Sequence, residues 1–154
     1  MPSTATLHPR IRTQLERTPD IAVAAAADAM ERGAEEIVAM MKTLAPHDDG
    51  DLRDSIGWTW GDEPKGSLKI GTIRSGRNAG RQFATLKITF FVGAFYAHMV
   101  EFGTSPHAQP KMRRIHPGTS AQPFFYAAWR AKKAGFRRKI RTAVRKAIRE
   151  ALRG

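Results

Sequence analysis

The chain of 154 residues contains no cysteine, which excludes disulfide bonds, thiol catalysis and cysteine-based zinc sites. It also lacks an apolar run near the roughly 18 residues that a membrane-spanning helix needs, so we expect no membrane partner. Residues 1–17 lack the apolar stretch of a secretory signal peptide, which favours synthesis in the cytoplasm. A hydrophobic content of 42% is sufficient for one globular domain, and we expect residues 1–154 to form it.

Acidic residues are scarce in the last part of the chain. Residues 124–154 hold eleven of the 26 lysines and arginines but only one of the 14 aspartates and glutamates. This segment therefore carries a formal charge of +10, whereas the other 123 residues carry +2. Such a concentrated positive charge indicates a polyanionic partner, either a nucleic acid or the acidic face of a protein.

The first helical pattern follows an N-terminal extension over residues 1–17. Thr18-Pro19-Asp20 is typical of a helix start, with a capping hydroxyl and a proline in the first turn. From Met30 onward, apolar residues recur at spacings of three and four, until Pro46 disfavours further helix. The sequence therefore predicts a long amphipathic helix over about residues 18–45.

The middle of the chain is typical of a small sheet. Residues 51–93 contain β-favouring segments near 52–60, 68–73 and 85–92, with a predicted hairpin turn over residues 61–66. Two segments rich in glycine, proline and basic residues are predicted loops that could reach a neighbouring subunit. They are residues 75–82 and the longer loop or arm over residues 105–120.

A second helix is predicted over residues 123–153, with a kink or break at Gly135. Within it, five arginines step by four residues beside a parallel apolar row, and each row drifts by about 40° per step around a helix. The five, called the arginine ladder below, are Arg137, Arg141, Arg145, Arg149 and Arg153. The predicted fold class is α+β, with a long N-terminal helix and a basic C-terminal helix packed on a small, mainly antiparallel β-sheet.

The arginine ladder leaves several partners open. Guanidinium groups suit phosphate oxygens, which favours contact with DNA or RNA. An acidic protein surface, the acids of a neighbouring subunit or plain solvation of an exposed face explain the same pattern. A dedicated nucleic-acid-binding protein would more often spread its positive charge beyond one helix, whereas the remainder of this chain is nearly neutral.

Signals for catalysis and metal binding are weak. The five histidines show no HExxH spacing, and the acids Asp48, Asp49, Asp51 and Asp54 do not fit an EF-hand loop. Glu63-Pro64-Lys65 has the acid-x-lysine spacing of some nucleases, but Pro64 is unsuited to the central strand that such a site needs. We therefore assign no catalytic residue, no metal ligand and no cofactor.

Three blocks of sequence occur in a specific order. The first spans Ala45-Pro46 and Gly50 to Ile56, the second spans Tyr96 to Thr104, and the third is Gln122-Pro123-Phe124-Phe125. Together they resemble the siphophage neck family of head–tail joining or tail-completion proteins, a group similar to the minor tail protein Z of lambda-like phages. The positions that carry the resemblance are Pro46, Gly50, Leu52, Ser55, Ile56, Tyr96, Ala97, Glu101, Phe102, Gly103, Thr104, Pro123 and Phe124.

The resemblance implies structural roles for these positions. Tyr96, Phe102 and Phe124 are expected to pack helices onto the sheet, and glycines are expected at turns that a side chain would hinder. Glu101 stands among apolar neighbours, so it is expected to need a donor such as Arg53 or a backbone amide.

The resemblance also implies a function. It is that of a non-enzymatic virion component at the head–tail junction, assembled with other copies into a ring around the DNA channel. The implied neighbours are the phage connector (adaptor or stopper), the tail-terminator or other tail proteins, and DNA in the channel. The alternative from composition alone is a small basic nucleic-acid-binding protein that uses its C-terminal helix.

Overall fold

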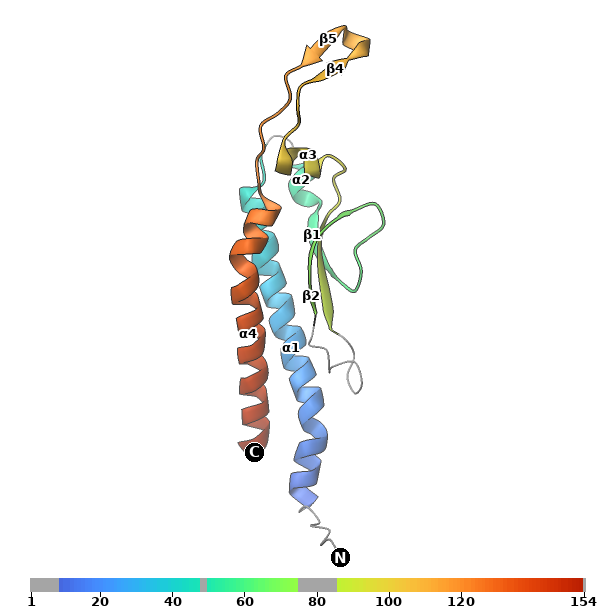
Figure 1. Cartoon of the computed structure of the whole chain (residues 1–154). Coiled ribbons are helices and arrows are strands. Elements are labelled where there is room, and N and C mark those ends of the chain that lie inside the picture. The colour runs from blue at the N-terminus through green and yellow to red at the C-terminus, as the bar shows by residue number, and fades with distance from the viewer. Residues whose placement is uncertain (1–8, 48–49, 75–85, 154) are drawn as a thin grey trace, which may run out of the picture.

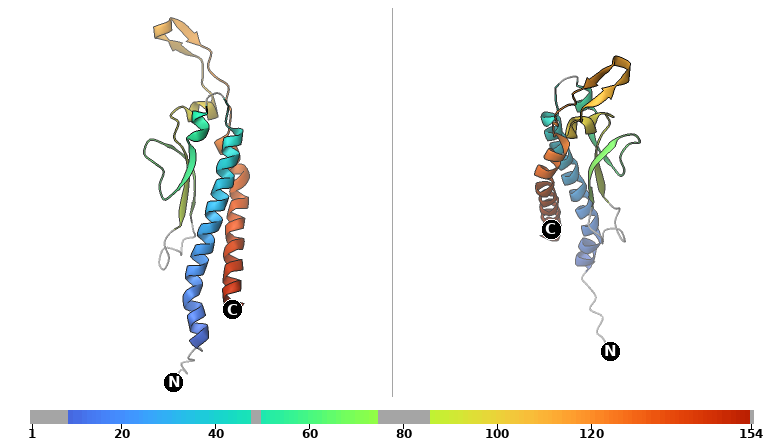
Figure 2. Two further views of the ribbon diagram at one scale, coloured as in Figure 1. Left: turned by 180° about the vertical axis from the view of Figure 1, so that it is seen from behind. Right: turned by 45° about the horizontal axis from the view of Figure 1, so that its top comes forward.

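The computed structural model describes residues 9–47, 50–74 and 86–153. Two long helices, α1 (Pro9–Leu44) and α4 (Phe125–Arg153), lie side by side and run in opposite directions (Figure 1). A small sheet packs against them, and a narrow arm projects from the end opposite to the start of α1 and the end of α4 (Figures 1 and 2). This arrangement confirms the predicted α+β class.

Helix α1 is longer than predicted, because it begins at Pro9 and passes through Pro19 without ending. The prediction that the helix begins at residue 18 was therefore wrong. A proline removes one backbone donor, which is a local cost that leaves the hydrogen bonds on either side in place. The alanines that follow from Ala22 favour a helix strongly and outweigh that cost.

Helix α4 is continuous across Gly135, so the predicted break there does not exist. A glycine costs about 1 kcal/mol in a helix relative to alanine. The next residue, Phe136, is buried between the helices and the sheet, where its ring makes an edge contact with Phe90. This packing stabilises the helix on both sides of the glycine.

The sheet has the strand order β1-β3-β2, with β1 (Ile56–Trp60) and β2 (Leu68–Arg74) each antiparallel to the central β3 (Lys87–Val92). Residues 61–67 therefore cross from one edge of the sheet to the other, and the predicted hairpin at 61–66 was wrong. Strand β3 lies in the centre of the sheet, and its apolar side chains Ile88, Phe90 and Val92 are all buried there. The sheet is antiparallel as predicted.

The core lies between α1, α4 and one face of the sheet. The side chain of Trp129 on α4 packs directly over Gly71 of β2, where an added Cβ would lie 2.6 Å from the indole. The largest fully buried side chains come from α1, from β3 and from the start of α4. They are Met30, Ile37, Met41, Ile88, Thr89, Phe90, Val92, Phe124 and Phe125.

Short elements occupy the end of the molecule that carries the arm. They are the helices α2 (Asp51–Asp54) and α3 (Ala97–Phe102), and the arm itself. The segment that looked like strand from Leu52 therefore begins as a helical turn, and the strand starts at Ile56. The other predicted loop, residues 75–82, lies outside the described residues.

Candidate interaction site

Glu101 joins the end of α3 to the start of α4. The residue is 2% exposed, and its carboxylate accepts three backbone N–H groups, from Phe124 at 2.7 Å, Phe125 at 3.2 Å and Tyr126 at 3.3 Å. These amides have no acceptor inside the helix because they belong to its first turn. A carboxylate at a helix N-terminus satisfies them and is favoured by the helix dipole.

Arg53, the other donor considered for Glu101, binds elsewhere. Its guanidinium donates to the carbonyl oxygen of Ala45, with Nη2 at 2.9 Å, and so joins α2 to the end of α1. Ser55 closes the same turn, since its Oγ donates to the carbonyl of Leu52 at 2.7 Å. Leu52 and Ile56 are buried beside this turn. The first sequence block thus forms the corner between α1 and the sheet.

Two glycines form the base of the arm. Gly103 has a φ of 71°, and a Cβ there would lie 2.6 Å from the carbonyl oxygen of Thr119. Gly118 has a φ of 83°, and a Cβ there would lie 2.2 Å from the carbonyl oxygen of Thr104. The close approach allows Thr104 and Thr119 to form an antiparallel bridge with backbone bonds of 2.9 and 3.1 Å. Only glycine fits these two positions.

The arm is a two-stranded hairpin rather than a plain loop. Strands β4 (His107–Gln109) and β5 (Arg114–His116) pair antiparallel around the short 3-10 helix η2 (Pro110–Met112). The rings of His107 and His116 stack at 5.0 Å across the pair. Because Glu101 holds the chain before the arm to the chain after it, both ends of the arm are fixed to the body.

The arm exposes apolar and basic side chains together. Met112 is 63% exposed and Ile115 is 73% exposed, beside Lys111, Arg113 and Arg114. At the other end of the arm, Phe102 is 65% exposed and Phe95 is 81% exposed. Phe102 was expected to pack helices onto the sheet, but its ring meets only the edge of the body, 5.8 Å from Tyr126. The sequence alone did not distinguish this exposed aromatic from the buried Phe124.

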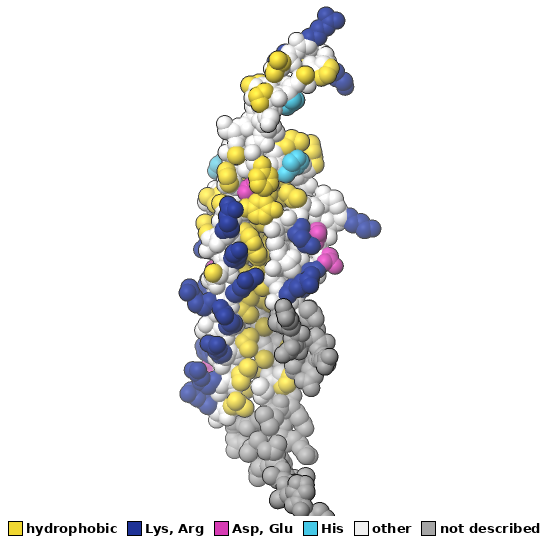
Figure 3. All heavy atoms as spheres, in the orientation of Figure 1, with side chains coloured by type: hydrophobic (Ala, Val, Ile, Leu, Met, Phe, Trp, Pro, Cys, Tyr) yellow, Lys and Arg dark blue, Asp and Glu magenta, His cyan; other side chains and the backbone are white. Residues whose placement is uncertain are grey.

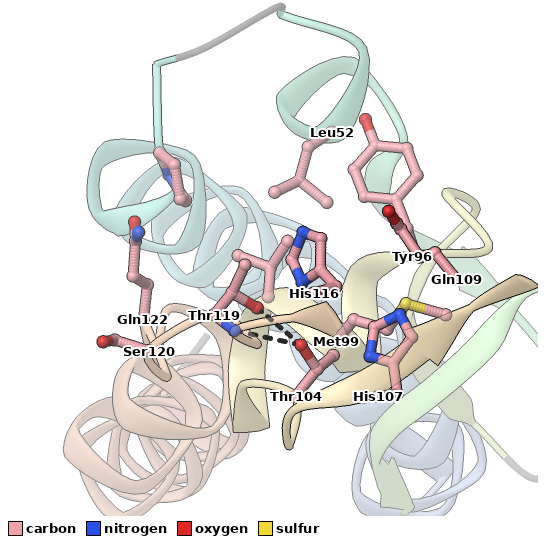
Figure 4. A pocket seen from close by; sticks show the side chains of 12 residues that line it. Leu52, Tyr96, Met99, Thr104, His107, Gln109, His116, Thr119, Ser120 and Gln122 are labelled. Atoms are coloured by element: carbon pink, nitrogen blue, oxygen red, sulfur yellow. Dashed lines mark hydrogen bonds between the residues drawn. The ribbon is translucent and has the colours of Figure 1, made fainter. Parts of the chain in front are cut away.

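A pocket of about 430 Å³ lies at the base of the arm (Figure 4). One wall consists of α2 and α3, and the opposite wall is the arm itself. Its apolar lining is formed by Pro46, Leu52, Tyr96, Met99 and Val100. Several positions of the first two sequence blocks therefore meet in one concave, mainly apolar surface.

The arginine ladder lies on the outer side of α4. All five of its arginines are exposed, and lysine and arginine side chains form a column along α4 beside a stripe of hydrophobic side chains (Figure 3). Lys139 is an exception among the basic residues of α4, because it points toward α1 and pairs with Glu36 at 2.5 Å. The arrangement gives α4 a basic outer face and an inner face that packs on α1.

The pair between Glu36 and Lys139 predicts a pH dependence. The hydrogen bond from Lys139 lowers the pKa of Glu36 below its usual range. Stability from this pair is therefore fully present above about pH 4.3, the usual pKa of glutamate, and is lost as the pH falls through the lowered pKa. Both side chains are about half exposed, so solvent screening limits the contribution to roughly 0.5 kcal/mol. Urea unfolding at pH 7 and pH 3 should show that Glu36→Gln destabilises less at pH 3 than at pH 7.

The regions considered for catalysis contain no assembled reaction centre among the described residues. Glu63 lies in the loop between β1 and β2 and pairs with Lys69 at 2.9 Å, not with Lys65. Within the described ranges, no three His, Asp or Glu side chains lie close enough to hold a metal ion. Asp48 and Asp49 fall outside those ranges. Among the described helices, none is long and apolar enough to cross a membrane.

The fold and these surfaces define a small α+β protein with an arm that is fixed at its base and a last helix with a basic outer face. The model of one protein family matches residues 10–103, which is more than half of the chain. The chain belongs to that family, described as "Bacteriophage HK97-gp10, putative tail-component". No curated protein and no solved structure matches the chain.

The family match includes the first sequence block and all of the second except Thr104. It ends at Gly103, two residues after Glu101, so the amides that Glu101 binds, the arm and α4 all lie beyond it. The protein is accordingly a bacteriophage structural component of the tail or neck. Its arm and its arginine ladder have to be interpreted from their own geometry.

Proposed function

We propose that this protein is a structural virion component of the phage neck, where it joins the DNA-filled head to the tail. Copies of the chain form part of a ring around the DNA channel. The ring contacts the connector (adaptor or stopper) on one side and tail-terminator or other tail proteins on the other. Membership of the tail-component family supports this assignment.

The observation that carries the proposal is the arm. It projects away from the body, yet Glu101 and the bridge between Thr104 and Thr119 fix its base (Figure 1). Met112 and Ile115 at its tip are apolar and largely exposed. Exposure of such side chains to water does not stabilise a monomer, which favours a role in contact with another protein. Rigid projections with apolar tips are suited to contact neighbouring subunits, because little conformational freedom is lost on binding.

The decisive experiment removes the gene from the phage or prophage and examines the lysate by electron microscopy. We expect separate DNA-filled heads and free tails, and expression of the protein in trans should restore joined particles. Normal particles in the absence of the gene would contradict the assignment to the neck.

The arm itself can be tested by replacing Met112 and Ile115 together with serine. Both side chains are largely exposed, so the melting temperature should stay within about 2 °C of the original. Infectious titre should fall at least tenfold, with unjoined heads and tails in the lysate. The matched control is Leu44→Ser, because Leu44 is also exposed but belongs to α1 and lies outside the arm. Wild-type titre for the arm variant would exclude the arm from assembly.

The second candidate function is binding of nucleic acid through α4. The five exposed arginines of the ladder favour it, since guanidinium groups contact phosphates without reading sequence. If all five contact phosphates, the logarithm of the duplex binding constant should fall with the logarithm of salt concentration with a slope of about −4 to −5. A response that is nearly flat would leave the acidic protein surface as the partner of the ladder.

A further inference from the structure

Helix α1 carries a row of acids on the side that faces away from α4. Gly33 marks the side that faces α4, because a Cβ on it would lie 2.1 Å from the ring of Phe136. At 100° per residue, all four acids of the row lie between about 140° and 220° around the helix from Gly33. This acidic row consists of Asp20, Asp28, Glu31 and Glu35, and all four are exposed.

Helix α4 carries a corresponding basic row on the side that faces away from α1. Phe136 marks the inner side, since its ring contacts Gly33. Four arginines lie between about 140° and 220° around α4 from Phe136, and within the described residues none of them forms an ion pair. This basic row consists of Arg138, Arg141, Arg145 and Arg149, and it shares three members with the arginine ladder.

The two rows also match in height along the molecule. The helices are antiparallel, so residues before Gly33 and residues after Phe136 proceed toward the same end (Figure 1). Asp20, Asp28 and Glu31 lie 13, 5 and 2 residues before Gly33. Arg149, Arg141 and Arg138 lie 13, 5 and 2 residues after Phe136. Because each residue rises about 1.5 Å, each of these three acids has an arginine at its own level on the opposite side of the helix pair.

The carboxylates at the upper end of the acidic row are held in place. The indole N–H of Trp58 donates to Glu35 at 2.8 Å, and that of Trp60 donates to Glu31 at 3.1 Å. Trp60 is partly exposed beside them. An indole face next to a fixed carboxylate is a favourable surface for a guanidinium group, through a cation–π contact and an ion pair together.

We propose that the basic row of one copy docks on the acidic row of the next copy. This inference rests on the proposed ring, and it specifies which surfaces form the ring contact. An interface between two different faces of the same chain closes into a ring when successive copies are related by a rotation that divides a full turn, without translation along the axis. Rotation about an axis parallel to the helices leaves height unchanged, which is the condition that the matched levels satisfy. The ladder then lies mainly between copies.

A cysteine pair tests the contact directly, because the chain has no cysteine of its own. Asp28→Cys with Arg141→Cys places the two thiols on opposite outer faces of one copy, too far apart for a disulfide within the chain. The variant is supplied in trans to a phage that lacks the gene, and purified particles are oxidised and run on a denaturing gel. We expect multimers that disappear on reduction, with monomers only from either single-cysteine variant. Monomers only from double-cysteine particles would overturn the proposed interface.

Charge reversal gives a second, independent test. Arg141→Glu with Arg149→Glu should lower titre at least 100-fold, since like charges facing across an interface cost several kcal/mol. Adding Asp20→Arg and Asp28→Arg to the same chain should restore titre to within about tenfold, because the opposite charges face each other again. Lys65→Glu with Arg74→Glu is the control, since both positions are exposed and change the net charge equally. Unchanged titre, or loss without restoration, would contradict the inference.

The two tests separate this inference from the proposed function. Normal particles from a phage without the gene would contradict the neck assignment itself. Unjoined heads and tails without the gene, together with no cross-links and no charge rescue, would keep the neck assignment and exclude this interface. If DNA were the partner of the basic row, Arg141→Glu with Arg149→Glu would still lower titre. Adding Asp20→Arg and Asp28→Arg on α1 would then not restore it.

Discussion

Replacing Glu101 with alanine is expected to lower the free energy of unfolding by about 3 kcal/mol. The change leaves the backbone N–H groups of Phe124, Phe125 and Tyr126 without the carboxylate that accepts them in a buried place. For a chain of this size the melting temperature should fall by roughly 6–12 °C. Urea unfolding followed by circular dichroism measures the loss, and hydrogen exchange should show that the three amides lose protection.

Two further variants make the Glu101 prediction specific. Glu101→Gln keeps the shape and one oxygen but turns an N–H₂ group toward the amides, so we expect about half the loss. Glu150→Ala removes an exposed acid near the far end of α4 and should change stability by less than about 0.5 kcal/mol. An unfolding midpoint for Glu101→Ala equal to that of Glu150→Ala would show that the carboxylate does not hold α4.

The second large effect concerns the contact between α1 and α4. Gly33→Ala should destabilise the protein by about 2 kcal/mol, although alanine is the better helix former. The new Cβ would lie 2.1 Å from two ring atoms of Phe136, and that ring is buried against Phe90, so it cannot move freely. Phe136→Ala alone should cost about 3–5 kcal/mol, because it leaves a cavity between the helices and the sheet.

The double variant distinguishes this clash from a general intolerance of Gly33. Once Phe136 is alanine, Gly33→Ala fills part of the cavity and improves helix propensity, so it should be neutral or stabilising. The sign of the effect therefore reverses between the two backgrounds, and chemical unfolding of the four proteins measures the coupling. Equal losses in both backgrounds would show that the ring is not what Gly33 accommodates.

The parts of the fold that follow from short-range patterns were predictable. The spacing of apolar residues identified both long helices, and alternation identified the central strand, because these signals act within a few residues. The errors at Pro19 and Gly135 have one cause, since local helix breakers were outweighed by the helix on either side and by the packing of Phe136. Local propensity is a weak guide where tertiary contacts decide.

The order of the strands and the details of the site were not predictable from such patterns. The strand order β1-β3-β2 depends on which strand pairs with both of the others. That pairing is decided by contacts between segments that are far apart in the chain. The need of Glu101 for donors followed from its apolar surroundings, but its choice of three amides 23 to 25 residues away required the fold. The matched rows on α1 and α4 emerge only when the contact between Gly33 and Phe136 aligns the two helices.

Because α1 and α4 are antiparallel, the two ends of the molecule differ and can be told apart by a label at one of them. The start of α1 and the end of α4 lie at one end, and the arm lies at the other (Figure 1). A compact label fused after α4 would therefore sit at the opposite pole from the arm, at a separation comparable with the roughly 50 Å length of α1. Seen beside the capsid in projection images, such a label would reveal whether the arm points toward the genome or toward the tail tube.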